Sequence, residues 1–110
     1  MDKPTKITVR EDETGTTVVG TGSLDLYISD EFKAALKQAC ERDVGLIVDL
    51  RDAFYIDTAI IADLAGAGKR MRDRGKTLRV IVSKGSHPLR TLTITGLTAL
   101  MELVEEPAGG

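Results

Sequence analysis

Two segments near the start of the chain have the residue patterns of β-strands. Ile7 and Val9 are separated by polar residues, which is the period of a half-buried strand. Residues 16–21 are β-branched apart from Gly20, and the polar stretch 11–15 between the two segments ends in glycine. Apolar or β-branched runs joined by such a turn are typical of a hairpin. We therefore expect the chain to begin with two antiparallel strands.

Helical spacing follows this hairpin. Ser29 is a good N-cap and two acids come directly after it, so we predict a helix over residues 29–42. Its apolar positions, spaced as one helix face requires, are Phe32, Leu36, Ala39 and Cys40. Gly45 ends this helix, and the short apolar run 46–50 then predicts a central strand that is buried on both faces.

The alternation of helix and strand continues through the second half of the chain. A second helix is predicted over residues 58–74, and its apolar stripe is formed by Ile61, Leu64, Ala65, Gly68 and Met71. A strand at 78–82, a third helix at 88–95 and a last strand at 101–104 follow.

This order of elements predicts the fold class. Strand–helix–strand units imply parallel strands joined by right-handed crossovers. We expect an α/β fold with one domain over residues 1–110, in which about three helices flank a mixed sheet of four or five strands. Residues 1–6 and 105–110 are expected to fray, as chain ends often do.

Composition and charge exclude several classes of function. The 110 residues are 42% hydrophobic and 29% charged with a net charge of -2, an ordinary globular balance. No basic stretch is interleaved with aromatic residues, so we expect no nucleic-acid partner. The N-terminal residues contain no apolar signal region, and the apolar run 59–61 is too short to span a bilayer. We expect a soluble, cytoplasmic protein that does not insert into membranes.

Side chains that carry chemistry are few. Cys40 is the sole cysteine and is expected to be a buried, inert thiol, and His87 is the sole histidine. Asp49, Asp52 and Asp57 cluster near strand ends, where three acids could bind a divalent cation weakly, but solvated loop charge is the better interpretation. We predict no catalytic residues, no metal and no cofactor, and we expect that the protein is not an enzyme.

Asp57 and Thr58 form the local feature that suggests a function. Either residue is a competent N-cap for the second helix. A hydroxyl at the start of a helix that follows a parallel strand is exposed at the carboxyl edge of the sheet, where partners tend to bind. Phosphate added there would face free backbone N–H groups and the positive end of the helix dipole. The fold could therefore tolerate phosphorylation at Thr58 while its surface changed sharply, and this is compatible with a capping role.

Several segments together resemble the STAS family, which is named for sulfate transporters and anti-sigma factor antagonists. In chain order they are Gly22-Ser23-Leu24-Asp25, Ile47-Val48-Asp49-Leu50, Tyr55-Ile56-Asp57-Thr58, Arg74-Gly75 and Thr95-Gly96-Leu97. Each motif alone is weak, and their order and spacing over residues 18–103 give the match its specificity.

The resemblance implies a partner and a mode of regulation. Thr58 matches the residue that a partner kinase phosphorylates, and Asp57 matches an acid that shapes the surface facing that kinase. The implied partner is an anti-sigma factor that is itself a serine/threonine kinase of the histidine-kinase-like ATPase type. The unphosphorylated domain binds this kinase and frees the sigma factor. The residues predicted to form the partner-binding surface are Asp25, Asp57, Thr58, Ala59 and Ile60.

Departures from the family pattern leave a second function open. Thr58 stands where serine is more frequent, and Ile60 stands where glycine is common, a combination more similar to the stressosome branch. Ile60 falls off the predicted apolar stripe, so we expect it to be exposed beside Thr58. The usual C-terminal helix is expected to be absent, which leaves one sheet face less covered and homo-oligomer formation open. The alternative function is a scaffold or adaptor, in a stressosome-like assembly or as a transporter accessory subunit.

Overall fold

The computed structural model describes residues 3–42 and 44–107, which form a mixed β-sheet with helices packed against it. In chain order the elements are β1 (Lys6–Glu11), β2 (Gly15–Leu24), α1 (Leu26–Glu41), β3 (Gly45–Asp49), β4 (Ala53–Ile56), α2 (Thr58–Asp73), β5 (Leu78–Ser83), α3 (His87–Ile94), the 3₁₀ turn η1 (Leu97–Leu100) and β6 (Glu102–Glu106).

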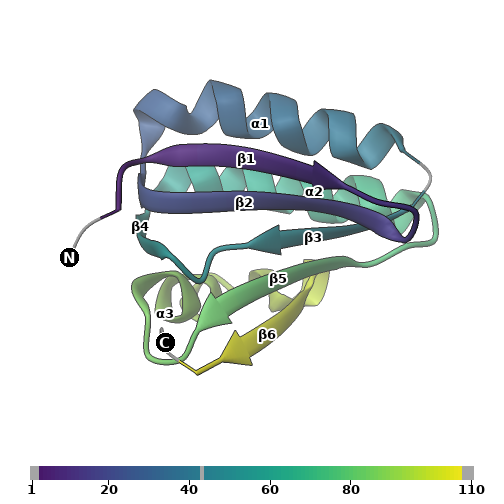
Figure 1. Ribbon diagram of the computed structural model, residues 1–110. Helices are drawn as coiled ribbons and strands as arrows, with labels where there is room; N and C mark the ends of the chain where they lie inside the picture. The colour runs from purple at the N-terminus through teal and green to yellow at the C-terminus, as the bar shows by residue number, and fades with distance from the viewer. Residues whose placement is uncertain (1–2, 43, 108–110) are drawn as a thin grey trace.

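The sheet has six strands, in the order β1-β2-β3-β5-β6, with β4 paired to β2 off this path. β1 runs antiparallel to β2, and the other pairs are parallel. In Figure 1 helix α2 lies behind β1 and β2, and α1, which packs against α2, runs above β1 along the top; the face toward the viewer carries no helix of the described residues. The predicted α/β fold is confirmed. Its sheet has more strands than expected because β4, which follows β3 after a short turn, was not recognised as a strand.

The core lies between the sheet and helices α1 and α2. β2 alternates strictly between buried and half-buried side chains, as a strand covered on one face does. β3 is central, as predicted, between β2 and β5. Its Leu46 and Val48 are buried, whereas Ile47, which faces the other way, is half-buried. The prediction that this strand is buried on both faces is therefore wrong at Ile47, because the helices cover one side only.

Helix α1 begins earlier than predicted. Asp25, not Ser29, is its N-cap, and the Asp25 carboxylate accepts a hydrogen bond of 3.0 Å from the backbone N–H of Tyr27. Ser29 lies inside the helix, is 6% exposed and donates to the carboxylate of Asp63. Because β2 ends at Leu24, Asp25 is the first residue free to turn into the helix and cap it. The ranges of α2 and α3 agree with prediction to within about one residue.

The strands reach further toward both ends of the chain than expected. β1 begins at Lys6, and β6 includes Glu105 and Glu106, so these residues belong to the sheet rather than to frayed ends. Ahead of β1, the hydroxyl of Thr5 donates to the carbonyl of Ser23 at 2.9 Å. Residues 1–2 and 108–110 of the predicted frayed ends lie outside the described residues. Within the part described, we find no helix with the length and apolar character that crossing a membrane requires.

Candidate functional site

Two helix N-termini emerge side by side from the carboxyl edge of the sheet. β2 and β4 are parallel and pair Leu24 with Ile56, and the N–H of Asp57 donates to the carbonyl of Leu24 at 3.2 Å. Asp25 and Asp57, the residues that follow these two strands, therefore lie next to each other, and each begins a helix. This edge is on the left of Figure 1, where β4 passes into α2. The sheet thus brings together two residues predicted for the partner-binding surface that are far apart in sequence.

Asp57 caps helix α2 and leaves Thr58 accessible. The Asp57 side chain accepts hydrogen bonds from the N–H groups of Ala59 at 3.0 Å and Ile60 at 3.3 Å. Thr58 is the first residue of the helix and its side chain is exposed, while Ala59 is half-buried. An exposed hydroxyl in the first turn of a helix is accessible to a kinase and lies in the positive field of the helix dipole.

Ile60 does not belong to the exposed surface. Its exposed fraction is 0%, and it lies in the hydrophobic core. The buried stripe of α2 is Ile60, Leu64, Ala67 and Met71, at intervals of four, three and four residues. The expectation that Ile60 is exposed and supplies contact area to a partner is therefore wrong. Its physical role is to anchor the first turn of α2 to the sheet.

Four exposed side chains stand on the elements that meet at this edge, and we call them together the aromatic patch: Leu26, Tyr27, Phe54 and Tyr55. Tyr27 is 96% exposed and Leu26 68% at the start of α1, and on β4 Phe54 is 46% and Tyr55 40% exposed. The chain has two tyrosines and two phenylalanines in all, so three of its four aromatic residues are exposed at this edge. Exposed aromatic side chains are enriched at protein-binding surfaces.

Sequence reasoning did not select Leu26, Tyr27 or Phe54. The sequence feature that points to these residues is the small number of aromatic side chains. Three of the four lie close to strand ends that lead into helices. Only the pairing of β2 with β4 places those two strand ends together.

His87, at the start of α3, supports the strand that leads to Thr58. Its ring stacks on that of Tyr55, with centroids 4.8 Å apart and planes inclined by 27°. The N–H of Ile56 donates to His87 Nδ1 at 3.3 Å. β4 uses its other edge to pair with β2, so His87 supplies a partner on the edge that has no strand. His87 thus holds β4, and with it Thr58, against the body of the domain.

A buried polar contact joins α1 to α2 close to their N-termini. Ser29 donates to Asp63 at 2.8 Å, and the ammonium group of Lys33 lies 3.9 Å from the same carboxylate. Burial raises the pKa of Asp63, although the Ser29 hydrogen bond and the Lys33 charge oppose this effect. The folded state therefore binds this proton more tightly than the unfolded chain does. Protonated Asp63 therefore stabilises the folded domain. This stabilisation is complete below the ordinary pKa of aspartate and is lost as the pH rises through the raised pKa of Asp63.

The acids considered as a weak cation site are used in other ways. Asp49 accepts two hydrogen bonds from the Arg51 side chain, at 3.0 and 2.8 Å. Asp52 pairs with Lys3 at 3.1 Å, and Asp57 caps α2. Among residues 3–42 and 44–107, no group of three or more histidine, cysteine, aspartate or glutamate side chains is placed to hold a metal ion.

Features at the opposite end of the sheet are separate from Thr58. A groove there is lined by residues that include Gly15, Gly45 and Thr77, at the amino ends of parallel strands. Cys40 is buried, as predicted, and its burial raises the pKa of its thiol, which disfavours the thiolate form. The candidate site is therefore an exposed surface at the carboxyl edge, made of Thr58, the two capping acids and the aromatic patch.

Comparison with protein families gives a match that spans most of the chain. The model described as "Mlab, STAS domain" matches residues 7–105. Among curated proteins, the chain is similar to the anti-sigma-B factor antagonist of Bacillus subtilis (strain 168). The two are 23% identical over 104 residues, which is 94% of each chain.

Solved structures share the same fold. An anti-sigma factor antagonist from Mycobacterium paratuberculosis superposes with a TM-score of 0.82 at 16% identity, covering 94% of this chain and 90% of the other. The Bacillus cell fate determinant SpoIIAA in its phosphorylated form gives a TM-score of 0.63 at 20% identity, covering 92% and 93% of the two chains. At these identities, the likeness shows that the architecture is shared.

Proposed function

The chain belongs to the STAS domain family, and we propose that it acts as an anti-sigma factor antagonist whose binding to a partner kinase is switched off by phosphorylation of Thr58. The observation that carries this proposal is the exposed Thr58 hydroxyl at the N-terminus of α2, at the edge of the sheet that also carries the aromatic patch. A regulatory domain of this kind acts by binding and is not an enzyme.

The relatives support the proposal. The similar protein of Bacillus subtilis is named an anti-sigma-B factor antagonist, and one structure with the same fold is of a phosphorylated protein. By this relation the partner is an anti-sigma factor and serine/threonine kinase of the histidine-kinase-like ATPase type, and the complex forms in the cytoplasm.

The placement of Thr58 explains how a phosphate would change binding with little change of fold. In the free domain the phosphate is exposed to water at a helix N-terminus, where negative charge is favourable. In a complex the same group, carrying about -1.5 to -2 charges, lies against a partner surface shaped for a neutral hydroxyl. Asp25 and Asp57 already place two carboxylates at this edge, and the added charge increases the repulsion from any acid on the partner.

The alternative is a scaffold or adaptor role. The observation that favours it is the sheet face without helices, which offers a second surface for assembly. In that case Thr58 would be incidental, and partner binding would depend on residues of the sheet.

Capture of partners from cells of the source organism tests the proposal. We expect wild-type protein to retain a kinase of the stated type, and the double variant Tyr27→Ala/Phe54→Ala to lose it. Truncation of an aromatic anchor to alanine reduces the free energy of binding by about 2 kcal/mol, which lowers the affinity roughly thirtyfold. The matched control is Val9→Ala/Ile94→Ala, which removes two exposed apolar side chains outside the patch. Equal capture by both variants would show that the aromatic patch is not the binding surface.

A further inference from the structure

The sheet face opposite α1 and α2 has an apolar centre. Side chains paired across neighbouring strands share a face, and the register therefore identifies the residues of the uncovered side. Its half-buried apolar residues are Val19, Ile47, Ile81 and Val104, one from each of β2, β3, β5 and β6. No helix of the described residues packs on them, as Figure 1 shows. We call this surface the open face.

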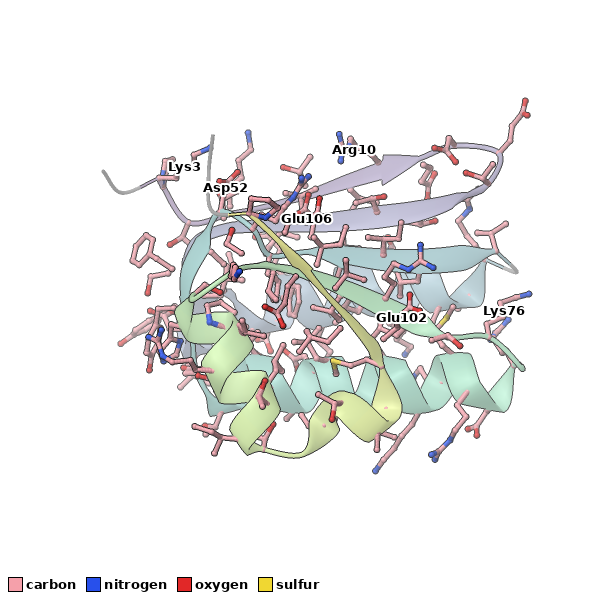
Figure 2. The ribbon with its side chains drawn as sticks, turned by 90° about the horizontal axis from the view of Figure 1, so that it is seen from below. Lys3, Arg10, Asp52, Lys76, Glu102 and Glu106 are labelled. Carbon is pink, nitrogen blue, oxygen red and sulfur yellow. The ribbon has the colours of Figure 1, made fainter. Side chains whose placement is uncertain are left out.

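The two edges of the open face carry opposite charges. Lys6 and Arg10 project from β1, and Glu102 and Glu106 from β6. Arg79 of β5 lies in the same row of this face as Glu102 and pairs with it within the chain. Figure 2 labels three of them: Arg10 extends from β1, and the two glutamates lie at the two ends of β6. The strand register places Arg10 and Glu102 in one row across the sheet, and Lys6 and Glu106 lie four residues further in the same direction.

We propose that the open face binds a second copy of this chain, face to face, about a twofold axis parallel to β3. Such a rotation places β1 of each copy over β6 of the other and keeps the rows in register. Arg10 then faces Glu102 of the second copy and shares that carboxylate with the second copy's Arg79. Lys6 faces Glu106 of the second copy. An isologous contact makes each pair twice, because the same patch serves on both copies. Sheets that pack face to face lie about 10 Å apart, a distance that long charged side chains span at the rim.

The centre of the face fits the same arrangement. Ile47 meets its own copy on the axis, and Val19 meets Ile81 of the second copy, which buries apolar surface. Asp49 also lies near the axis, where two carboxylates would repel each other. Each is neutralised by its own Arg51, which donates two hydrogen bonds to it.

The size of the face sets the strength of the dimer. Five strands spaced about 4.8 Å apart cover about 20 Å, and five residues along a strand cover about 16 Å. This footprint is smaller than the roughly 800 Å² that each partner buries in a standard stable complex. The dimer is therefore weak, forms as concentration rises and, because its rim is made of ion pairs, dissociates as salt rises.

Sedimentation equilibrium of the full chain tests this association. We expect the wild-type protein to shift from monomer to dimer with increasing concentration at low ionic strength, and the dissociation constant to rise at least tenfold in 1 M salt, where charges are screened beyond about 3 Å. A protein that stays monomeric at millimolar concentration and low salt would overturn the proposal.

Charge reversal tests the orientation of the two copies. We expect Lys6→Glu/Arg10→Glu to be monomeric alone, and Glu102→Lys/Glu106→Lys to be monomeric alone. Mixed together they should form a heterodimer, because all four facing pairs are then of opposite charge. The controls are Lys37→Glu/Lys69→Glu and Glu31→Lys/Glu41→Lys, which change the same charges on exposed helix positions and should dimerise as the wild type does. Circular dichroism verifies that each variant is folded. Failure of the mixture to associate, or loss of dimers in the controls, contradicts the arrangement.

Discussion

Phosphorylation of Thr58 is expected to lower the affinity of the domain for its kinase partner about a hundredfold while the fold stays the same. A loss of about 3 kcal/mol in the free energy of binding gives this factor, since each 1.4 kcal/mol changes the dissociation constant tenfold. The penalty arises because a doubly charged group that is solvated in the free protein must be desolvated against the partner. Calorimetric titration of the phosphorylated and the unmodified protein into the kinase measures the difference.

Three variants make this result specific to position. Thr58→Ala should fold normally and accept no phosphate at this site. Thr58→Glu should weaken binding, whereas Thr98→Glu, which adds the same charge at another exposed position, should not. Equal affinities of the phosphorylated and unmodified proteins would favour the scaffold function.

Ile60→Ala is expected to destabilise the domain by about 2–5 kcal/mol, the usual cost of truncating a buried isoleucine. Ile60 is 0% exposed and begins the buried stripe of α2, so the truncation leaves a cavity in the core under the first turn of this helix. Urea unfolding at neutral pH measures the loss. Ile94→Ala, at a position 83% exposed, should change the free energy of unfolding by less than about 0.5 kcal/mol. A loss below about 1 kcal/mol for Ile60→Ala would mean that its side chain does not pack as described.

The error at Ile60 shows how a helix stripe can be misread from sequence. Ile60 and Ile61 are adjacent, and each fits a helical spacing with Leu64 and Met71. The structure buries Ile60 fully and Ile61 partly, so the stripe extends toward Ile60 and Ala67 rather than toward Ile61 and Ala65, while Leu64, Gly68 and Met71 belong to both the predicted and the observed stripe. Ala67, also fully buried, completes the stripe with spacings of four, three and four, and this pattern was available in the sequence.

Other features depended on long-range pairing that local patterns do not contain. The order of strands and helices follows from changes of hydrophobic period, and the capping role of Asp57 follows from its residue type. β4 has only four residues and no alternation of burial, so its pairing with β2 defines it. That pairing also ends β2 at Leu24 and gives the capping role of α1 to Asp25 rather than Ser29, although both residue types are good caps.

The aromatic patch was unpredictable for the same reason. Tyr27 and Phe54 are far apart in sequence, and each alone is compatible with a core position. The elements that carry them meet at one edge of the sheet because β2 and β4 are parallel and end together.

The most direct test of the phosphorylation switch is to map where the partner kinase places phosphate. The captured kinase is incubated with this protein and Mg²⁺–ATP, and the modified residue is identified by mass spectrometry, with Thr58→Ala as the control. Our account predicts phosphate on Thr58 in the wild-type protein and none on the Thr58→Ala variant. Phosphate on another residue, or efficient phosphorylation of the Thr58→Ala variant, would contradict it.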